Sequence, residues 1–379
     1  MMNENVFKLD ESWKDVSAII PFGLGRIGKR VLPKLLEVFE VPFIIDNGVA
    51  EKKYRDIPVY NLQEALHLIG ERKIVVITIE RIYVDISKQL KNAGYVEYRD
   101  YCIFERFIEE WHYKYERKCY LPKLDTAITS RCTLGCSHCA MFTPYCQQRS
   151  DCSLEELKNN FNQLFRVVDY VFEYTLFGGE PFLHEQLSDV IDYLGEHFKE
   201  KIGQIVIITN GTIVPEPELL LTLQKYHVII SISDYTAVHP YAATLSKLLR
   251  AFDDYQIQYY VNKQIEWKDH CFPEHSCEYD EEYLPEHMKV CGYTCHSVNE
   301  MKLYYCDVAW GARKHAGYQD LKEDYIDLAA VLESNSIEQA KLRIVEYCMG
   351  KVNDKGYMSL CKYCAGMGAD NQRIIQAGT

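Results

Sequence analysis

Short apolar runs alternate with amphipathic helical patterns in the first part of the chain, as is typical of a parallel α/β fold. Helical patterns follow Gly25, Asn61 and Ile82. The apolar runs predict four strands, at residues 16–23, 42–46, 73–79 and 95–104. Together they amount to one half of a dinucleotide-type Rossmann fold. A charged segment then predicts a connecting helix at residues 105–118.

The same alternation starts again and runs longer in the middle of the chain. Five strands are predicted at residues 123–129, 170–179, 204–211, 227–234 and 256–262. Helical patterns separate them at residues 153–168, 184–198, 216–226 and 241–252. This repeat predicts a partial (β/α) barrel or an open sheet, and both place reactive groups at the carboxyl ends of the strands.

The last part of the chain has less regular patterning. It is rich in cysteine and predicts one hairpin at residues 300–310 and one helix at residues 336–347. We therefore expect three domains, at residues 1–118, 119–266 and 267–379.

Composition narrows the function classes. The 379 residues are 47% apolar and carry a formal net charge of −13, which argues against a nucleic-acid partner and leaves small-molecule, peptide or protein substrates open. No signal peptide and no long apolar span stand out, so we expect a cytoplasmic protein without a membrane partner. Fifteen cysteines in such a chain favour metal ligation over disulfides.

Three cysteines follow the first strand of the barrel-like repeat. Cys132, Cys136 and Cys139 fall within eight residues, a spacing that suits zinc or an iron-sulfur cluster. Structural zinc would need a fourth ligand, and His138 would be cramped between two of the cysteines. A cluster held by three cysteines instead leaves one iron open for a small chelating ligand.

The motif "CTLGCSHC" resembles the cysteine motif of the radical S-adenosylmethionine (radical SAM) family. Three further motifs fall where that family contacts S-adenosylmethionine, namely "FGGEP" after the second strand of the repeat, "ITNG" after the third and "SISDY" after the fourth. The resemblance covers residues 124–264 and extends to residue 364 with the tail.

This resemblance implies that Cys132, Cys136 and Cys139 hold a 4Fe-4S cluster whose open iron binds S-adenosylmethionine. An electron from a flavodoxin- or ferredoxin-type donor then yields a 5'-deoxyadenosyl radical, which abstracts a substrate hydrogen. The residues that the resemblance assigns to S-adenosylmethionine are Gly178, Gly179, Glu180 and Pro181, with Thr209 and Ser233 for the carboxylate and ribose.

A second group of cysteines lies in the tail, namely Cys291, Cys295, Cys306, Cys361 and Cys364. It resembles the auxiliary-cluster tails called twitch and SPASM, although Met301 stands where a glycine is usual. A single auxiliary 4Fe-4S cluster on Cys306, Cys361 and Cys364, with either Cys291 or Cys295, is the interpretation we favour. Structural zinc is the alternative. Cys271 and Cys277 are alternates, but ordinary thiols are the interpretation we favour for them, and the remaining cysteines are typical packing residues.

The N-terminal segment "FGLGRIGKR" places Gly23, Gly25 and Gly28 in the G-x-G-x-x-G spacing between a strand and a helix, with Asp46 ending the next strand. That context suits a nucleotide or nucleotide sugar, with the pyrophosphate at the helix N-terminus and Asp46 on a ribose hydroxyl. The region resembles Rossmann-like domains of sugar-modifying proteins. The alternative is that the glycines serve helix–strand packing alone.

Taken together, the motifs predict an oxidoreductase-like radical SAM enzyme acting on a small, sugar-like or nucleotide-linked substrate, for example by dehydrogenation. A SPASM-type peptide or protein maturase is the first alternative. A non-catalytic nucleotide-binding protein with structural zinc sites is the alternative from another class.

Overall fold

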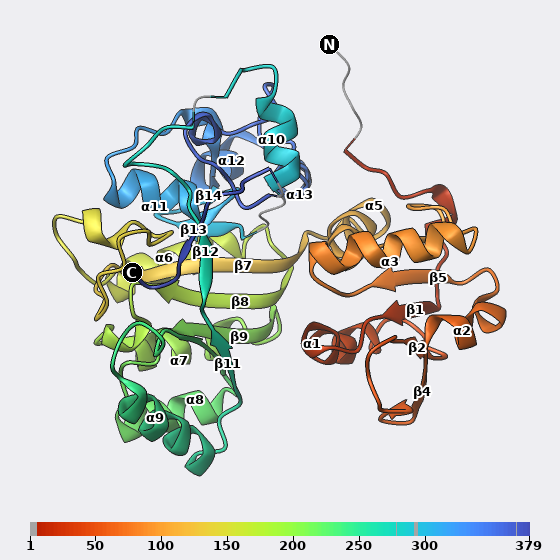
Figure 1. Cartoon of the computed structure of the whole chain (residues 1–379). Coiled ribbons are helices and arrows are strands. Elements are labelled where there is room, and N and C mark those ends of the chain that lie inside the picture. Colours follow the sequence, from red (N-terminus) through yellow and green to blue (C-terminus); the bar gives the residue numbers. More distant parts are fainter. Residues whose placement is uncertain (1–5, 278, 292–294, 369) are drawn as a thin grey trace. The chain divides into compact units, whose positions relative to one another are not determined.

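The computed structural model describes residues 6–277, 279–291, 295–368 and 370–379 (Figure 1). The chain divides into two compact units, Met1–Pro122 and Lys123–Thr379. The sequence predicts the first boundary after residue 118. The predicted barrel and tail both fall within the second unit, where their strands share one sheet.

The first unit is built on a six-stranded sheet in the order β3-β4-β2-β1-β5-β6. Its strands are β1 (Ile19–Phe22), β2 (Ile44–Ile45), β3 (Lys53–Tyr54), β4 (Ile57–Tyr60), β5 (Lys73–Val76) and β6 (Tyr101–Ile103). All pairs are parallel except the β3–β4 hairpin. The central strands β1 and β5 are buried along their whole length, which explains why they read as unbroken apolar runs.

Helices connect the strands of this sheet. They are α1 (Arg26–Leu35), α2 (Leu62–Ile69) and α3 (Glu80–Asn92), followed after β6 by α4 (Phe104–Arg106), the π-helical segment η2 (Phe107–Trp111) and α5 (His112–Glu116). A single 3-10 turn, η1 (Glu11–Trp13), precedes β1. Asn61 and Glu64 form a capping box that starts α2 where the sequence predicts it. The β3–β4 hairpin was not predicted, because its strands are too short to give an alternating pattern.

The glycine loop between β1 and α1 is held from two sides. The Asp46 carboxylate accepts hydrogen bonds from the backbone N–H groups of Leu24 (2.6 Å), Gly48 (2.7 Å) and Val49 (2.9 Å). A Cβ at Gly28 would lie 2.0 Å from the carbonyl oxygen of Gly23, whereas a Cβ at Gly25 would meet nothing within 4 Å. Asp46 thus already binds the loop backbone, and this geometry supports the packing role for Gly23 and Gly28.

The second unit is built on an eight-stranded sheet in the order β11-β10-β9-β8-β7-β13-β14-β15. Its barrel strands are β7 (Tyr120–Thr129), β8 (Tyr170–Gly178), β9 (Ile202–Thr209), β10 (Ile229–Asp234) and β11 (Tyr259–Lys263). The pairs from β8 to β11 are parallel, which confirms the predicted α/β class with parallel sheets.

Four helices alternate with the barrel strands close to the predicted positions (Figure 1). They are α6 (Leu154–Leu164), α7 (Leu187–His197), α8 (Pro217–Lys225) and α9 (Ala242–Asp254). Short 3-10 turns follow β7 and β8, at η3 (Thr143–Tyr145) and η4 (Pro181–Leu183). No helix within the described ranges has the length and hydrophobicity of a membrane span.

The tail adds three strands beside β7. They are β13 (Ser297–Asn299), which runs parallel to β7, and β14 (Lys302–Tyr304) and β15 (Tyr325–Asp327), which are antiparallel. A separate two-stranded sheet joins β12 (Glu266–Lys268) to β16 (Ile374–Gln376). The tail helices and turns are α10 (Leu284–Cys291), α11 (Asp307–His315), η5 (Lys322–Asp324), α12 (Leu328–Ser334), α13 (Ile337–Cys348) and η6 (Ser359–Lys362).

The hairpin predicted at residues 300–310 lies a few residues earlier in the chain, where β13 pairs with β14. The turn lies at Glu300 and Met301, both left-handed (φ 53° and 57°), and joins β13 to β14. The second half of the predicted hairpin belongs to α11 instead. Left-handed turns are usually signalled by Asn-Gly or Asp-Gly, and Glu-Met gives no such signal. The left-handed backbone of Met301 also explains why glycine suits this position.

Gly28→Ala tests the packing role of the first glycine loop. We expect it to lower the free energy of unfolding by about 1–3 kcal/mol, since the new Cβ overlaps the Gly23 carbonyl and forces the backbone to move. Gly25→Ala is the matched control and should cost less than about 1 kcal/mol. Chemical denaturation of the full chain measures both, and equal losses would contradict the packing assignment.

Candidate cofactor site at the barrel strand ends

The loop after β7 carries the first three cysteines. Cys136 is buried, while Cys132 and Cys139 are half-buried. Burial and, to a smaller extent, the neighbouring thiols of Cys139 and Cys132 together raise the pKa of the Cys136 thiol to about 11. The Ser137 N–H and hydroxyl both donate to the Thr379 carbonyl, at 2.7 and 2.8 Å. The three thiols therefore interact with one another on a loop that is fixed by the C-terminal segment.

The glycines after β8 allow this loop to approach closely. A Cβ at Gly178 would lie 2.2 Å from the Thr129 carbonyl oxygen, and one at Gly179 would lie 2.1 Å from that of Arg131. The Gly179 N–H donates to Thr129 (2.8 Å) and the Glu180 N–H to Arg131 (2.7 Å). Any larger side chain at these two positions would push the cysteine loop away from β8.

The Glu180 side chain is fully buried and accepts three hydrogen bonds. The donors are the Phe182 N–H (3.0 Å), the Thr209 hydroxyl (2.8 Å) and the Asn210 N–H (2.7 Å). Burial raises the pKa of the carboxyl to about 7, although these three hydrogen bonds lower it. The carboxylate thus joins the ends of β8 and β9, and its role is structural as well as electrostatic.

Asn210 was not among the predicted site residues, although it lies inside the "ITNG" motif. Its side-chain amide lies 3.7 Å from the Cys132 sulfur and donates to the Thr133 hydroxyl at 3.1 Å. The adjacent Thr209 is 1% exposed, and its hydroxyl donates to Glu180 while accepting from the Gly211 N–H. Asn210 is therefore better placed than Thr209 to act at the cysteine loop.

Ser233, at the end of β10, is half-buried beside two tyrosines. Burial raises the pKa of the Tyr235 phenol, and a hydrogen bond with Ser233 partly offsets that rise. The Tyr241 hydroxyl accepts from the Tyr235 N–H (2.7 Å) and donates to the Asn210 carbonyl (2.8 Å). The predicted residues of β7, β8, β9 and β10 therefore gather at one edge of the sheet, as the strand-end rule requires.

The donor set does not resemble a zinc site. Within the part of the chain that the structure describes, no three His, Cys, Asp or Glu side chains converge on a point where one metal ion would fit. His138, the candidate fourth zinc ligand, lies 3.7 Å from the Asp269 carboxylate instead. Because His138 lies at Asp269, three thiols remain, which suits a cluster with one open iron better than a closed zinc site.

In the tail, four of the five cysteines surround one cavity. The lining includes Cys291, Cys306, Cys361 and Cys364, together with Met288, Val308 and Met358. Burial raises the pKa of the Cys361 thiol to about 12. Cys295 lies elsewhere, with its sulfur 3.6 Å from the Lys123 ammonium. Between the two alternatives for the fourth ligand, the geometry favours Cys291.

The backbone also supports thiolates at this cavity. The Gly366 N–H lies 3.4 Å from the Cys364 sulfur, and the Met367 N–H lies 3.3 Å from the Cys291 sulfur. His287 bridges the Cys364 carbonyl (2.9 Å) and the Asp370 carboxylate (2.7 Å). N–H groups directed at sulfur stabilise anionic ligands, so the donor chemistry fits an iron-sulfur cluster.

The other cysteines lie outside both sets. Cys271 and Cys277 are buried together against Ala365. Cys102, Cys119 and Cys348 are buried, whereas the thiols of Cys146 and Cys152 lie near the carbonyls of Gln148 and Ala127.

Comparisons with known proteins agree with the strand-end site. Residues 126–238 match the family model described as the radical SAM superfamily. AlbA, the antilisterial bacteriocin subtilosin biosynthesis protein of Bacillus subtilis (strain 168), is 32% identical over 107 residues. That alignment spans 28% of this chain and only 22% of AlbA.

Two solved structures are similar over longer stretches. The enzyme anSMEcpe with bound AdoMet aligns with a TM-score of 0.41 at 12% identity, over 64% of this chain and 84% of that one. SuiB of Streptococcus suis, bound to S-adenosylmethionine, aligns with a TM-score of 0.31 at 16% identity, over 47% of this chain and 37% of SuiB. The family match covers the cysteine loop and the ends of β8, β9 and β10. Residues 126–238 of this chain are therefore a radical SAM domain, whose cofactors are a 4Fe-4S cluster and S-adenosylmethionine.

Proposed function

We propose that this chain is an enzyme that oxidises a carbon centre of its substrate, using the cluster site at Cys132, Cys136 and Cys139 and an auxiliary cluster in the tail. The single observation that carries the proposal is the gathering of these three thiols over the glycine–glycine–glutamate turn of a radical SAM domain. When bound, the two clusters and S-adenosylmethionine would supply a radical that removes a substrate hydrogen and an acceptor for a second electron.

The chain's own residues would position this chemistry. The glycine backbone at Gly178 and Gly179 lies against the cysteine loop and leaves room for the amino end of S-adenosylmethionine. Glu180 and Asn210 fix the neighbouring strand ends through their hydrogen bonds. Ser233 remains a candidate contact to the ribose. The electron donor stays a prediction.

An auxiliary cluster on Cys291, Cys306, Cys361 and Cys364 is the interpretation we favour for the tail. Four thiols that line one cavity can supply the four thiolates of a 4Fe-4S cluster. The two backbone N–H groups directed at Cys364 and Cys291 support the same assignment.

For the substrate, we propose a peptide. AlbA, whose name assigns it to bacteriocin biosynthesis, is 32% identical over its aligned part. A small sugar-like or nucleotide-linked substrate is the second candidate, since an α/β unit with a glycine loop precedes the radical SAM domain. Incubation of the reconstituted enzyme with a peptide encoded beside its gene, followed by mass spectrometry, separates the two.

Replacing Cys132, Cys136 and Cys139 with alanine tests the radical chemistry. Anaerobically reconstituted wild-type protein should release 5'-deoxyadenosine when reduced with S-adenosylmethionine present, because the three thiolates hold the cluster. The triple variant should release none, and Cys146→Ala on the same loop should behave as wild type. Absence of 5'-deoxyadenosine from the wild type, or its release by the triple variant, would refute the proposal.

The triple variant also isolates the tail. We expect about four irons per chain to remain in it, and adding Cys291→Ala should remove them. Adding Cys295→Ala instead should leave the iron content unchanged, because Cys295 lies outside the cavity. Iron and acid-labile sulfide assays measure this. Zinc as the sole bound metal would exclude the auxiliary cluster.

Glu180→Gln tests the buried carboxylate. The amide keeps one acceptor oxygen but turns an N–H₂ group toward backbone donors, so we expect a loss of about 1–3 kcal/mol in the free energy of unfolding. Binding of S-adenosylmethionine should weaken as well, because the ends of β8 and β9 lose their common anchor. Glu185→Gln is the control, since Glu185 is exposed and makes one surface ion pair with Arg131 (3.4 Å). Calorimetry reads both effects, and a variant as stable as the control would disprove the anchoring role.

A further inference from the structure

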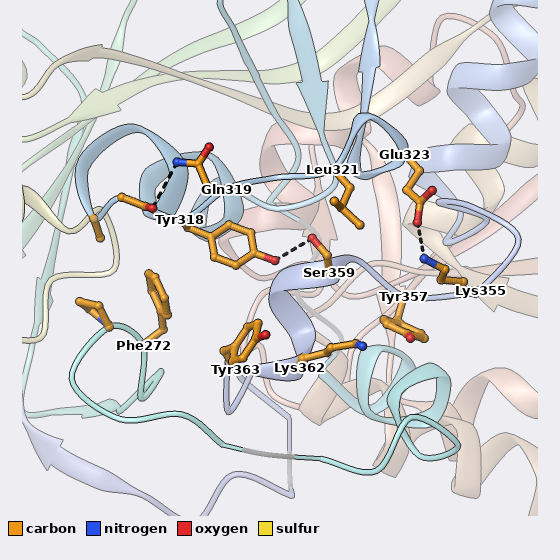
Figure 2. Close-up of a pocket in the computed structure, with 13 residues that line it drawn as sticks. Phe272, Tyr318, Gln319, Leu321, Glu323, Lys355, Tyr357, Ser359, Lys362 and Tyr363 are labelled. Atoms are coloured by element: carbon orange, nitrogen blue, oxygen red, sulfur yellow. Dashed lines mark hydrogen bonds and ion pairs between the residues drawn. The ribbon is translucent and has the colours of Figure 1, made fainter.

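A pocket of about 620 Å³ lies in the tail, apart from the two cysteine sites (Figure 2). Its volume falls within the ordinary range for small-molecule sites. Residues 357–364 form the wall between this pocket and the four-cysteine cavity. Tyr357, Ser359, Lys362 and Tyr363 line the pocket, whereas the residues that alternate with them line the cavity.

One side of the pocket is aromatic. Figure 2 shows Phe272, Tyr318 and Tyr363 grouped together in this view. The Phe272 and Tyr318 rings lie 5.6 Å apart at 86°, and the Tyr318 and Tyr363 rings lie 6.2 Å apart at 63°. Edge-to-face rings of this kind hold one another in place and leave faces available to a flat ring.

Hydrogen bonds connect the side chains at the floor of the pocket. The Tyr318 hydroxyl donates to the Ser359 hydroxyl at 2.7 Å. Ser359 in turn donates from its backbone N–H to the Asp324 carboxylate at 2.7 Å, and from its hydroxyl to the same carboxylate. Asp324 is only 2% exposed. This chain of hydrogen bonds fixes Tyr318 and η6 before any ligand arrives, which lowers the entropic cost of binding.

The other side of the pocket is charged. Lys355 pairs with Glu323 at 2.5 Å, and Lys362 pairs with Glu281, which lies outside the lining. The lining thus presents two ammonium groups, each paired with one carboxylate, in a chain whose net charge is −13. Exposed ion pairs of this kind contribute little energy, so a multiply charged anion can compete for both ammonium groups.

We propose that this pocket binds a small anionic ring compound of the mononucleotide class. The base would lie against Phe272, Tyr318 and Tyr363, and the phosphate would lie at Lys355 and Lys362. Aromatic faces bind bases by stacking, and lysine ammonium groups are common phosphate ligands. None of the three loop cysteines lines this pocket, although Phe272 also lines a small cavity beside Cys139. Because residues 357–364 also carry Cys361 and Cys364, a bound ligand would lie directly behind the wall of the auxiliary site.

Isothermal titration calorimetry of the full chain with adenosine 5'-monophosphate tests the proposal. Saturating S-adenosylmethionine is present, so that its adenine subsite is filled. We expect a dissociation constant of about 1 mM or lower for the nucleotide, and at least about tenfold weaker binding for adenosine and for ribose 5-phosphate. Equal binding of ribose 5-phosphate would refute the base contact, and equal binding of adenosine would refute the phosphate contact.

Variants assign the binding to this pocket. Lys362→Met should weaken nucleotide binding at least about tenfold but leave adenosine binding unchanged, and Leu321→Trp should fill the pocket and abolish both. Lys199→Met, at a lysine whose side chain is 73% exposed and lies outside the pocket, is the control. Far-ultraviolet circular dichroism verifies folding. No nucleotide binding at about 10 mM, or binding that survives both pocket variants, would overturn the proposal.

Discussion

The cofactor site depends on one buried carboxylate. Glu180 has no exposed surface, yet it accepts hydrogen bonds from Phe182, Thr209 and Asn210. A buried acceptor of this kind must be satisfied, because leaving it unpaired would cost more than each bond contributes. The ends of β8 and β9 are thereby held at a fixed spacing. The Glu180 N–H and the Asn210 amide in turn hold the cysteine loop against these strand ends.

In the tail, one short segment separates two cavities. There the constraint is an alternation along residues 357–364, with one set of side chains facing the cysteine cavity and the other facing the nucleotide-class pocket. The segment is short and is fixed at Ser359 by the buried Asp324. A displacement of the side chains on one face therefore displaces those on the other, because closely packed residues transmit displacement.

The sequence predicts the barrel strands and their order of motifs well, because parallel strands buried on both faces leave long apolar runs. It also predicts which side chains share an edge, since "GGE" and "TNG" both end strands. Other features were hidden. The turn at Glu300 and Met301 lacks the usual glycine, so the hairpin was placed too late. The contact between Asn210 and Cys132 joins residues far apart in the chain. The choice between Cys291 and Cys295 likewise rests on which sulfur faces the cavity, and spacing alone leaves both open.

Both cysteine sets share a property that would link the proposed metal binding to the fold. Burial raises the pKa of the thiols of Cys136 in the loop and Cys361 in the tail, so each carries a proton near neutral pH when no metal is present. A cluster binds thiolates, and each ligand must therefore release its proton on assembly. The metal–sulfur bonds and the N–H groups directed at sulfur would offset the free-energy cost of burying these thiolates. In the tail, the backbone N–H groups of Gly366 and Met367 already point at sulfur. At Cys132, the Asn210 side-chain amide takes this role.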